Sequence, residues 1–391
     1  MAPARVPRPG MRVAVGIPSY QEADSIAHVV AQADQGLARL LGPARCVIVN
    51  VDGDSPDGTA EVFRATPTRC GKESFVCADQ PGGKGRNVLR FFRYCADTGV
   101  EALATLDADV TSVTPDWIDA LLTPVLDGRA DQVTPLYTRS RFEGATTNHF
   151  AYPLLYGAYG RDIRQPIAGD FGLSGALARH LLRQPVDDAV HGYGIDIFMS
   201  LHAAAGGFRQ AQAPLGRKLH KPSFPKRARI FHDVVTAGVG VTRGYGLLPR
   251  PVEPSTGGCS IDDSEDYPHA RQADELFEAM RVEAVRLAPA YRAWLGGEAA
   301  DLTAALEAAA PRVSSDMWAG VLAGAVLAAV SPGCREPSHA FAERLAPLYM
   351  MRAITFWIEN RRRDPRDVEA EVLAQARLFR RTLLARAGLT A

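Results

Sequence analysis

The stretch that decides the fold is Ala102-Leu-Ala-Thr-Leu-Asp-Ala-Asp109. Its first five residues predict a short buried strand, so that Asp107 and Asp109 lie at the carboxyl end of that strand. Two carboxylates at positions i and i+2 can hold a divalent cation and a ribose hydroxyl together. The same pattern also fits an acidic turn before the helix that Thr114-Pro115-Asp116 opens, with Thr114 as N-cap. Alone, the pair leaves both interpretations open.

Apolar runs alternate with stretches of helical spacing on the amino-terminal side of this strand. Strands are predicted at 12–17, 45–51 and 74–78, and helices at 24–41 and 87–96. This alternation predicts an α/β fold in which a mostly parallel sheet is covered by helices on both faces. Ligands of such sheets bind at the carboxyl ends of the strands.

Each predicted strand is followed by a polar cluster, and we expect these clusters to line one crevice. Pro18-Ser-Tyr-Gln-Glu22 follows the first strand, and Asp52-Gly-Asp-Ser-Pro-Asp-Gly-Thr59 follows the second. Asp52 can accept hydrogen bonds from a base or ribose, but this cluster also fits an acidic turn before a helix.

The third cluster, within residues 79–86, contains the glycine-rich sequence Pro81-Gly-Gly-Lys-Gly-Arg-Asn87. Its glycines would let backbone N–H groups approach phosphate, and Lys84 adds positive charge. The spacing of a Walker A loop is absent. A flexible basic loop without a ligand is the other interpretation.

Two further motifs lie beyond the predicted sheet. His191-Gly-Tyr-Gly-Ile-Asp196 places Asp196 in the first turn of a helix that runs to about Ala205, where a carboxylate also complements the helix dipole. In Lys218-Leu-His220-Lys221 a histidine stands between two lysines, a composition that suits a site for phosphates, although a lone histidine is more often an ordinary surface or core residue.

The remainder of the chain predicts a second, helical region. Residues 130–230 are less regular, and we expect loops and a short sheet extension there; 249–270 are expected to be a linker. Helical stretches are predicted at 272–287, 299–308, 317–330 and 341–384. We therefore predict a catalytic domain at 1–230 and a helical carboxyl-terminal region at 231–391, the latter a possible homodimer surface.

The composition excludes several function classes. The 391 residues contain 44 Lys and Arg against 44 Asp and Glu, so no global charge attracts nucleic acid or an anionic membrane. The apolar stretch 317–330 is shorter than the roughly 20 residues that a membrane span needs, and residues 1–10 do not resemble a signal peptide. The six cysteines form no C-x-x-C pair, which indicates reduced thiols and a cytoplasmic protein.

Taken in order, these motifs resemble a GT-A glycosyltransferase of the family-two superfamily. The resemblance rests on Ile17-Pro-Ser-Tyr-Gln-Glu22, Val51–Thr59, Gly83-Lys-Gly85 and Leu106–Asp109. A narrower likeness to the glucosyl-3-phosphoglycerate synthase and mannosylglycerate synthase families rests on three later motifs: Gln165-Pro-Ile-Ala-Gly-Asp170, Gly192-Tyr-Gly-Ile-Asp196 and Leu219-His220. It covers about residues 12–225, and those families also carry a helical tail.

The resemblance assigns a role to each matching residue. Nucleotide and sugar contacts are expected from Pro18, Glu22, Asp52 (base), Lys84 (base or phosphate), Asp107 (ribose), Gly169 and Asp170 (sugar pocket). Asp109 and His220 are expected to ligate Mn²⁺ or Mg²⁺, with Asp107 nearby. Asp196 faces the acceptor or the reacting sugar, and Asp196 and Asp107 are the catalytic candidates.

These roles imply transfer of a hexose from a UDP- or GDP-sugar to a small hydroxylated, glycerate-like acceptor, with retention of the anomeric configuration. An inverting enzyme with Asp196 as the base is the alternative. Where the phosphoglycerate enzymes have a Gly-Arg-x-Thr loop for an acceptor phosphate, this chain has Gly144-Ala-Thr-Thr147, with Arg139 and Arg141 nearby. The resemblance therefore does not extend to a phosphorylated acceptor.

A sugar-nucleotide pyrophosphorylase and a non-catalytic nucleotide-sugar-binding protein are two further alternatives. A sugar-nucleotide pyrophosphorylase would need a basic glycine-rich loop directly after the first strand, and Pro18–Glu22 contains neither Gly nor Lys. A non-catalytic nucleotide-sugar-binding protein remains open, although the acidic pair and His220 favour an enzyme.

Overall fold

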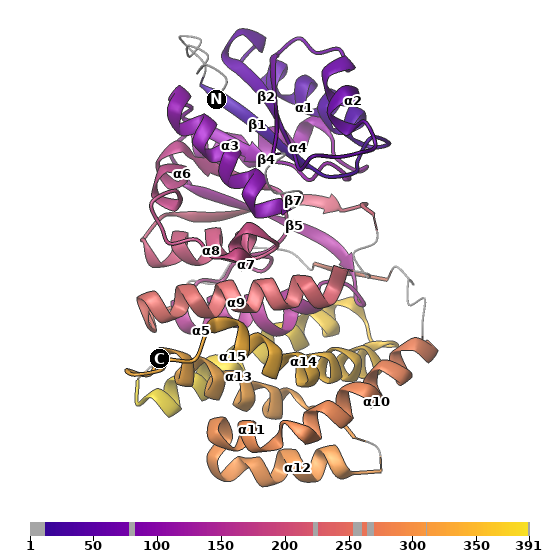
Figure 1. Cartoon of the computed structure of the whole chain (residues 1–391), viewed down its shortest axis with the longest axis vertical. Helices are drawn as coiled ribbons and strands as arrows, with labels where there is room; N and C mark the ends of the chain where they lie inside the picture. Colours follow the sequence, from indigo (N-terminus) through magenta and orange to yellow (C-terminus); the bar gives the residue numbers. More distant parts are fainter. Residues whose placement is uncertain are drawn as a thin grey trace. The chain divides into compact units, whose positions relative to one another are not determined.

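The computed structural model describes residues 12–77, 83–221, 226–252, 260–263, 270–309 and 311–389 (Figure 1). By internal packing the chain divides into two compact units. The first comprises Met1–Tyr137 and Ala168–Ser223, and the second comprises Thr138–Ile167 and Phe224–Ala391. The expected domain boundary at residue 230 does not coincide with this division, because residues 138–167 belong to the second unit. The domain boundary stays a prediction.

The first unit is built on a mixed sheet with strand order β3-β2-β1-β4-β6-β5-β7. Its strands are β1 (Val13–Ser19), β2 (Cys46–Asp52), β3 (Gly71–Val76), β4 (Ala102–Thr105), β5 (Gln132–Ser140), β6 (Phe171–Ser174) and β7 (Gln210–Arg217). Strands β1 to β4 run parallel to one another, and β6 is antiparallel to both β4 and β5. The expected fold class, a GT-A α/β domain with a mostly parallel sheet and a helical region after it, is confirmed.

Helices of the first unit connect the strands. They are α1 (Ile26–Leu40), the 3-10 turn η1 (Pro43–Arg45), α2 (Thr59–Ala65), α3 (Lys84–Thr98), α4 (Pro115–Leu126), α6 (Gly175–Leu181), α7 (Asp188–His191) and α8 (Ile195–Ala205). Thr114 is the N-cap residue of α4 and Pro115 its first helical residue, as predicted, but the Thr114 side chain makes no capping hydrogen bond. Helix α8 carries Asp196 in its first turn and ends at Ala205, as predicted.

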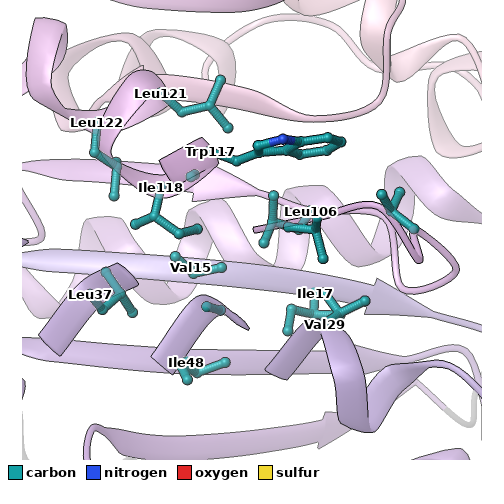
Figure 2. Close-up of a cluster of buried hydrophobic side chains, with 14 of the residues drawn as sticks. Val15, Ile17, Val29, Leu37, Ile48, Leu106, Trp117, Ile118, Leu121 and Leu122 are labelled. Carbon is teal, nitrogen blue, oxygen red and sulfur yellow. The ribbon is translucent and has the colours of Figure 1, made fainter. Parts of the chain in front are cut away.

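One hydrophobic core lies where α1 and α4 cover the sheet. Val15, Ile17 and Ile48 of β1 and β2 meet Val29 and Leu37 of α1, and all five side chains are fully buried (Figure 2). Every residue of β2 is buried, because helices cover both faces of the parallel strands and leave no polar face. This packing fixes the carboxyl ends of β1, β2 and β4.

The second unit is helical. Its elements are the π-helical turn η2 (Thr147–Ala151), α5 (Tyr152–Tyr159), α9 (Arg227–Tyr245), β8 (Ile261–Asp262), α10 (Ala270–Arg286), α11 (Ala288–Leu295), the 3-10 turn η4 (Gly296–Glu298), α12 (Ala299–Glu307), α13 (Ser315–Val330), α14 (Ser338–Asn360) and α15 (Pro365–Ala387). In its core, the Phe231 ring of α9 stacks on Tyr349 of α14, with ring centroids 3.8 Å apart.

A buried ion pair anchors residues 138–167 within this second unit. Nε and Nη2 of Arg164 donate to the two carboxylate oxygens of Glu369 on α15, over 2.8 and 3.0 Å. Both residues are at least nine-tenths buried, and Ser260 adds a third hydrogen bond to Glu369. These contacts explain why residues 138–167 belong with helices that lie 200 residues further along the chain.

Several sequence expectations need correction. Residues 130–230 are more regular than expected, since they contain β5, β6, β7 and five helices besides the start of α9. The predicted helix at 341–384 is two helices, α14 and α15, separated at Arg361–Asp364. The predicted strand at 74–78 begins three residues earlier, at Gly71. The predicted helix at 87–96 begins at Lys84.

The other expectations concern cysteines and membranes. The cysteines at 46, 70, 77, 95 and 334 are free thiols, and Cys259 lies outside the described residues. Residues 1–10, and parts of the predicted linker 249–270, also lie outside them. Across the described part of the chain, no helix combines the length and the apolar character of a membrane span.

Candidate functional site

Asp107 lies two residues after β4, and its carboxylate sits between two lysines of the same unit. Lys84 Nζ lies 2.8 Å from Oδ1, and Lys218 Nζ donates to Oδ2 over 2.8 Å. Burial alone would raise the pKa of Asp107, but the two ammonium groups outweigh it and hold this pKa well below its usual range. Asp107 is therefore an ionised carboxylate that is paired on both oxygens.

Lys84 reaches Asp107 from the first turn of α3, and glycines on either side of it make this approach possible. A Cβ on Gly85 would lie 1.8 Å from the carbonyl oxygen of Val190, and the Gly85 N–H donates to Gly192 O over 3.0 Å. Gly83 has a φ of 106°, in the left-handed region. These glycines allow α3 to pack closely against residues 190–192. Backbone N–H groups of this cluster were expected to face a phosphate, but the N–H of Gly85 is bonded to Gly192 O instead. Residues 79–82 of that cluster lie outside the described part.

Asp196, in the first turn of α8, faces the same ammonium group. Its Oδ1 lies 3.5 Å from Lys84 Nζ and, among the described residues, receives no hydrogen bond although it is buried. Burial raises the pKa of Asp196, Lys84 opposes this effect, and the nearby Asp107 adds to it. The catalytic candidates Asp196 and Asp107 therefore share Lys84 as their common neighbour.

Asp170 lies behind Asp107, directly before β6. Its side chain is fully buried: Oδ1 accepts the Asp107 N–H over 2.8 Å, and Oδ2 accepts Tyr137 OH and Lys218 Nζ, each over 2.6 Å. The neighbouring Gly169 has a φ of 94°, and a Cβ there would lie 2.1 Å from Asp107 Oδ2. Gly169 thus lies directly against the Asp107 carboxylate, whereas the buried Asp170 binds the backbone N–H of Asp107.

Asp109 differs from its neighbours because its carboxylate accepts no hydrogen bond from any residue that the structure describes. The residue is partly buried. Burial raises its pKa, Asp107 adds to that effect, and Lys218 and His220 oppose it by charge. A partly exposed carboxylate to which no described residue donates a hydrogen bond is open to a cation.

His220 is held close to Asp109 by its backbone neighbours. The Leu219 N–H donates to Ser112 Oγ over 2.9 Å, and the Thr111 N–H donates to Leu219 O over 2.9 Å. Nδ1 of His220 lies 2.7 Å from Lys221 O, and because a carbonyl only accepts, Nδ1 carries the proton. In the neutral ring the lone pair is then on Nε2, which is the arrangement found in metal-ligating histidines.

The loop after β1 completes this edge of the sheet. Glu22 pairs with Lys221 Nζ over 2.7 Å, and its pKa is raised by burial first, with Lys221 opposing and Asp109 adding to the rise. Gln21, next to it, has a φ of 60°, and its N–H donates to Ser55 Oγ over 2.9 Å. Pro18, partly buried, is the second-last residue of β1 and lies just before this loop.

Asp52 is satisfied by its own loops. Oδ2 accepts Ser19 Oγ over 2.7 Å and Ser55 Oγ over 2.8 Å, and Oδ1 accepts the Ser55 N–H over 2.7 Å. The residue is 1% exposed. The carboxylate therefore braces the loops after β1 and β2, as the alternative interpretation of this acidic turn suggested.

The structure thus brings nearly all predicted site residues to one edge of the sheet, and it adds two that sequence reasoning missed. The sequence pattern marks Lys218 only as one of the two lysines that flank His220, and it gives no signal for Tyr137. Tyr137 lies inside an ordinary strand, and no local pattern signals its hydroxyl bond to Asp170. Lys218 carried one signal, its position two residues before the candidate ligand His220.

The residues present fit a divalent cation. Asp109 supplies a partly exposed carboxylate, and the proton on Nδ1 of His220 makes Nε2 the basic nitrogen of the ring. Within the described ranges, no group of three or more His, Cys, Asp and Glu side chains is arranged to hold a metal ion. A cation bound here would thus take its other ligands from water or from oxygen atoms of a substrate, such as those of phosphates.

Comparison with known proteins completes this description. The model of glycosyl transferase family 2 matches residues 14–182. No curated protein matches the chain significantly. Among solved structures, the chain is similar to glucosyl-3-phosphoglycerate synthase from Mycobacterium tuberculosis in complex with Mn²⁺, UDP and glucosyl-3-phosphoglycerate, with a TM-score of 0.49 and 22% identity over 63% of this chain and 82% of that one.

Two further structures of that mycobacterial enzyme give similar values. The complex with Mn²⁺, UDP-glucose and phosphoglyceric acid has a TM-score of 0.48 and 20% identity over 62% of this chain and 88% of that one. The complex with Mg²⁺ and UDP has a TM-score of 0.48 and 22% identity over 63% and 82%. Residues 14–182, which contain nearly all of β1, the strands β2 to β6 and the Asp-Ala-Asp sequence, match the model of glycosyl transferase family 2, and the chain is a glycosyltransferase.

Proposed function

We propose that this glycosyltransferase is metal-dependent and transfers a hexose from a UDP- or GDP-sugar to a small hydroxylated acceptor of the glycerate type, with retention of configuration. The observation that carries the proposal is the pairing of Asp109, a carboxylate without a described hydrogen-bond donor, with His220, a ring whose Nδ1 proton is held by Lys221 O. Mn²⁺ or Mg²⁺ held by these two residues would neutralise charge on the departing diphosphate.

Lys84 is the residue proposed to contact the diphosphate directly. An ammonium group has three N–H donors, and Lys84 has Asp107 at 2.8 Å and Asp196 at 3.5 Å. At least one N–H therefore remains for a phosphate oxygen, and the side chain is 19% exposed. A fixed cation at this position stabilises the charge that develops on the leaving group.

The remaining site residues are proposed to shape the donor pocket. Pro18 and Glu22 would contact the nucleotide, and Asp107 the ribose. Asp52 would act on the base site through Ser19 and Ser55, which it holds. Gly169 would face the sugar, with Asp170 behind it as a support, because the Asp170 side chain is fully buried.

In the proposed reaction, a bond forms between an acceptor oxygen and the anomeric carbon while the bond from that carbon to the diphosphate oxygen breaks. The acceptor proton passes to the leaving phosphate oxygen. For the inverting alternative, Asp196 would take the proton, and its buried, unbonded Oδ1 supports this candidate. NMR of the product anomer separates the two mechanisms.

A panel of sugar nucleotides tests the proposal. Each donor is incubated with Mn²⁺, Mg²⁺ or a chelator and a set of hydroxylated acceptors, and release of UDP or GDP is measured. We expect release from one nucleotide class and its loss with the chelator. Tight donor binding without release for any donor would instead support a non-catalytic binding protein. The cytoplasmic location and a dimer through the helical region stay predictions.

A further inference from the structure

Lys218 is the most deeply buried cation of the site. It follows β7 directly, and its side chain is 4% exposed. Its Nζ donates to three oxygens: Asp107 Oδ2 over 2.8 Å, Asp170 Oδ2 over 2.6 Å and Ala168 O over 2.9 Å. A lysine is rarely buried to this degree unless its charge is paired.

These contacts occupy the whole ammonium group. Lysine has three N–H donors, and three oxygens within hydrogen-bond distance accept them. The Tyr137 ring covers the group further, with its centroid 5.3 Å from Nζ. Unlike Lys84, Lys218 therefore has no donor left for a substrate phosphate, and any role in the reaction must act through its neighbours.

The contacts also close a ring of hydrogen bonds around Asp107. Lys218 binds the Asp107 side chain and the Asp170 carboxylate, and that carboxylate accepts the Asp107 backbone N–H. One buried ammonium thus fixes both the side chain and the backbone at the start of the Asp-Ala-Asp sequence. Asp109 follows two residues later, so its position depends on this anchor.

The same anchor fixes His220 from the other side. Lys218 and His220 flank Leu219, whose N–H and C=O both bond to residues 111 and 112, directly after Asp109 and Val110. The segment that carries His220 is therefore fastened at Lys218 by its side chain and at Leu219 by its backbone. Movement of Lys218 would change the spacing between His220 and Asp109.

We propose that Lys218 is a positioning residue for the divalent cation and, through it, for the donor diphosphate: its ammonium sets the spacing of Asp109 and His220. This inference rests on the proposed function, because it takes these two residues as the metal ligands. It assigns the two lysines different tasks, with Lys84 contacting the donor and Lys218 holding the residues that do.

The test compares Lys218→Met with the double variant Lys218→Met/Asp170→Asn. The single variant leaves Asp170 buried with its main charged partner gone, so it will lose stability for that reason alone. The double variant removes that buried charge as well, so the fold recovers while the anchor stays absent. Lys72→Met is the matched control, since Lys72 also donates to three oxygens, the backbone carbonyls of Phe63, Arg64 and Thr66.

Mn²⁺ affinity in the presence of UDP is measured for each protein by electron paramagnetic resonance, with thermal unfolding and steady-state kinetics beside it. We expect the double variant to unfold near the wild-type temperature and to bind Mn²⁺ about 10–100-fold more weakly, the range for loss of an outer-shell contact. Its KM for the donor should rise, and Lys72→Met should keep wild-type Mn²⁺ affinity.

Wild-type Mn²⁺ affinity and KM in the double variant would overturn the inference, because Lys218 would then only neutralise Asp170. Such a result would leave the proposed function standing. Absence of Mn²⁺ binding by the wild-type protein with UDP and also with GDP would overturn both together.

Discussion

Gly169 is a position at which the site tolerates little change. Its φ of 94° disfavours any side chain, and a Cβ would meet Asp107 Oδ2 at 2.1 Å and Lys218 Nζ at 2.9 Å. We predict that Gly169→Ala destabilises the fold by about 1–3 kcal/mol and raises the donor KM at least about tenfold, because Asp107 must move. Urea unfolding and donor kinetics measure both effects.

Gly207→Ala is the matched control for this substitution. Gly207 has a φ of 75°, but no atom lies within 4 Å of its Cβ position. The control should lose stability from the backbone conformation alone and keep its donor KM. An unchanged KM in Gly169→Ala would show that Asp107 does not depend on this close contact.

Single residues also mark the limit of what the sequence predicts about the site. Asp107, Asp109, Asp196 and His220 are recognisable because a polar cluster after a strand, or a known motif, surrounds them. Tyr137 of β5 and Lys218, which follows β7, contact Asp170 although both are distant from it in sequence. Such partners become visible only when the order of strands in the sheet is known.

Among the elements, α1 and the start of β3 are joined by one buried carboxylate. Oδ1 of Asp34 accepts the N–H groups of Arg69 and Cys70, and Oδ2 accepts Arg69 Nε over 3.0 Å. Burial alone would raise the pKa of Asp34, but these hydrogen bonds outweigh it and lower the pKa. The ionised carboxylate therefore stabilises the fold above its ordinary pKa, and this contribution is lost as the pH falls through the lowered one.

Asp34→Asn should therefore lower the free energy of unfolding by roughly 1–3 kcal/mol at neutral pH. The difference from the wild type should shrink below about pH 4, because there the Asp34 carboxylate of the unfolded chain takes up its proton before that of the folded chain. Urea unfolding across this range checks the sign. A difference that does not change with pH would contradict the assignment to the ionised form.

Elements were predictable where the hydrophobic pattern was unambiguous. The parallel strands β1, β2 and β4 are continuous apolar runs, as strands buried on both faces must be. Strand β3 is only partly buried, and its predicted bounds were displaced accordingly. The break between α14 and α15 had a local signal, because Asp364 caps α15 and Pro365 is its first residue, a pattern typical of a helix start.

For the whole molecule, Arg164 and Glu369 form one of the buried contacts that join residues 138–167 to the helical unit, beside hydrogen bonds such as Trp318 to His149 O and Arg380 to Gly157 O. We predict that Arg164→Met lowers the stability of that unit by about 3–5 kcal/mol, because Glu369 stays buried without its main partner. Arg164→Met/Glu369→Gln should recover most of the loss. Thermal unfolding with a probe in the helical region measures it.

The exposed pair Arg12–Glu101 provides the comparison. Its side chains are 40% and 55% exposed, so Arg12→Met should cost far less stability than Arg164→Met. Equal losses in Arg164→Met and Arg12→Met would contradict an anchoring role for the buried pair. No sequence pattern predicted the buried pair, because its partners are far apart in the chain and belong to no motif.

The central claim about the whole enzyme is that Asp109 and His220 hold the cation on which glycosyl transfer depends. The direct test is the rate of nucleoside diphosphate release from the best donor, titrated with Mn²⁺, in the wild type, Asp109→Asn and His220→Gln. Asp116→Asn, whose side chain is 81% exposed, is the control. We predict that both site variants need at least about tenfold more Mn²⁺ for half-maximal rate, while the control follows the wild-type curve. Release that does not depend on Mn²⁺, or site variants that follow the wild-type curve, would contradict the account.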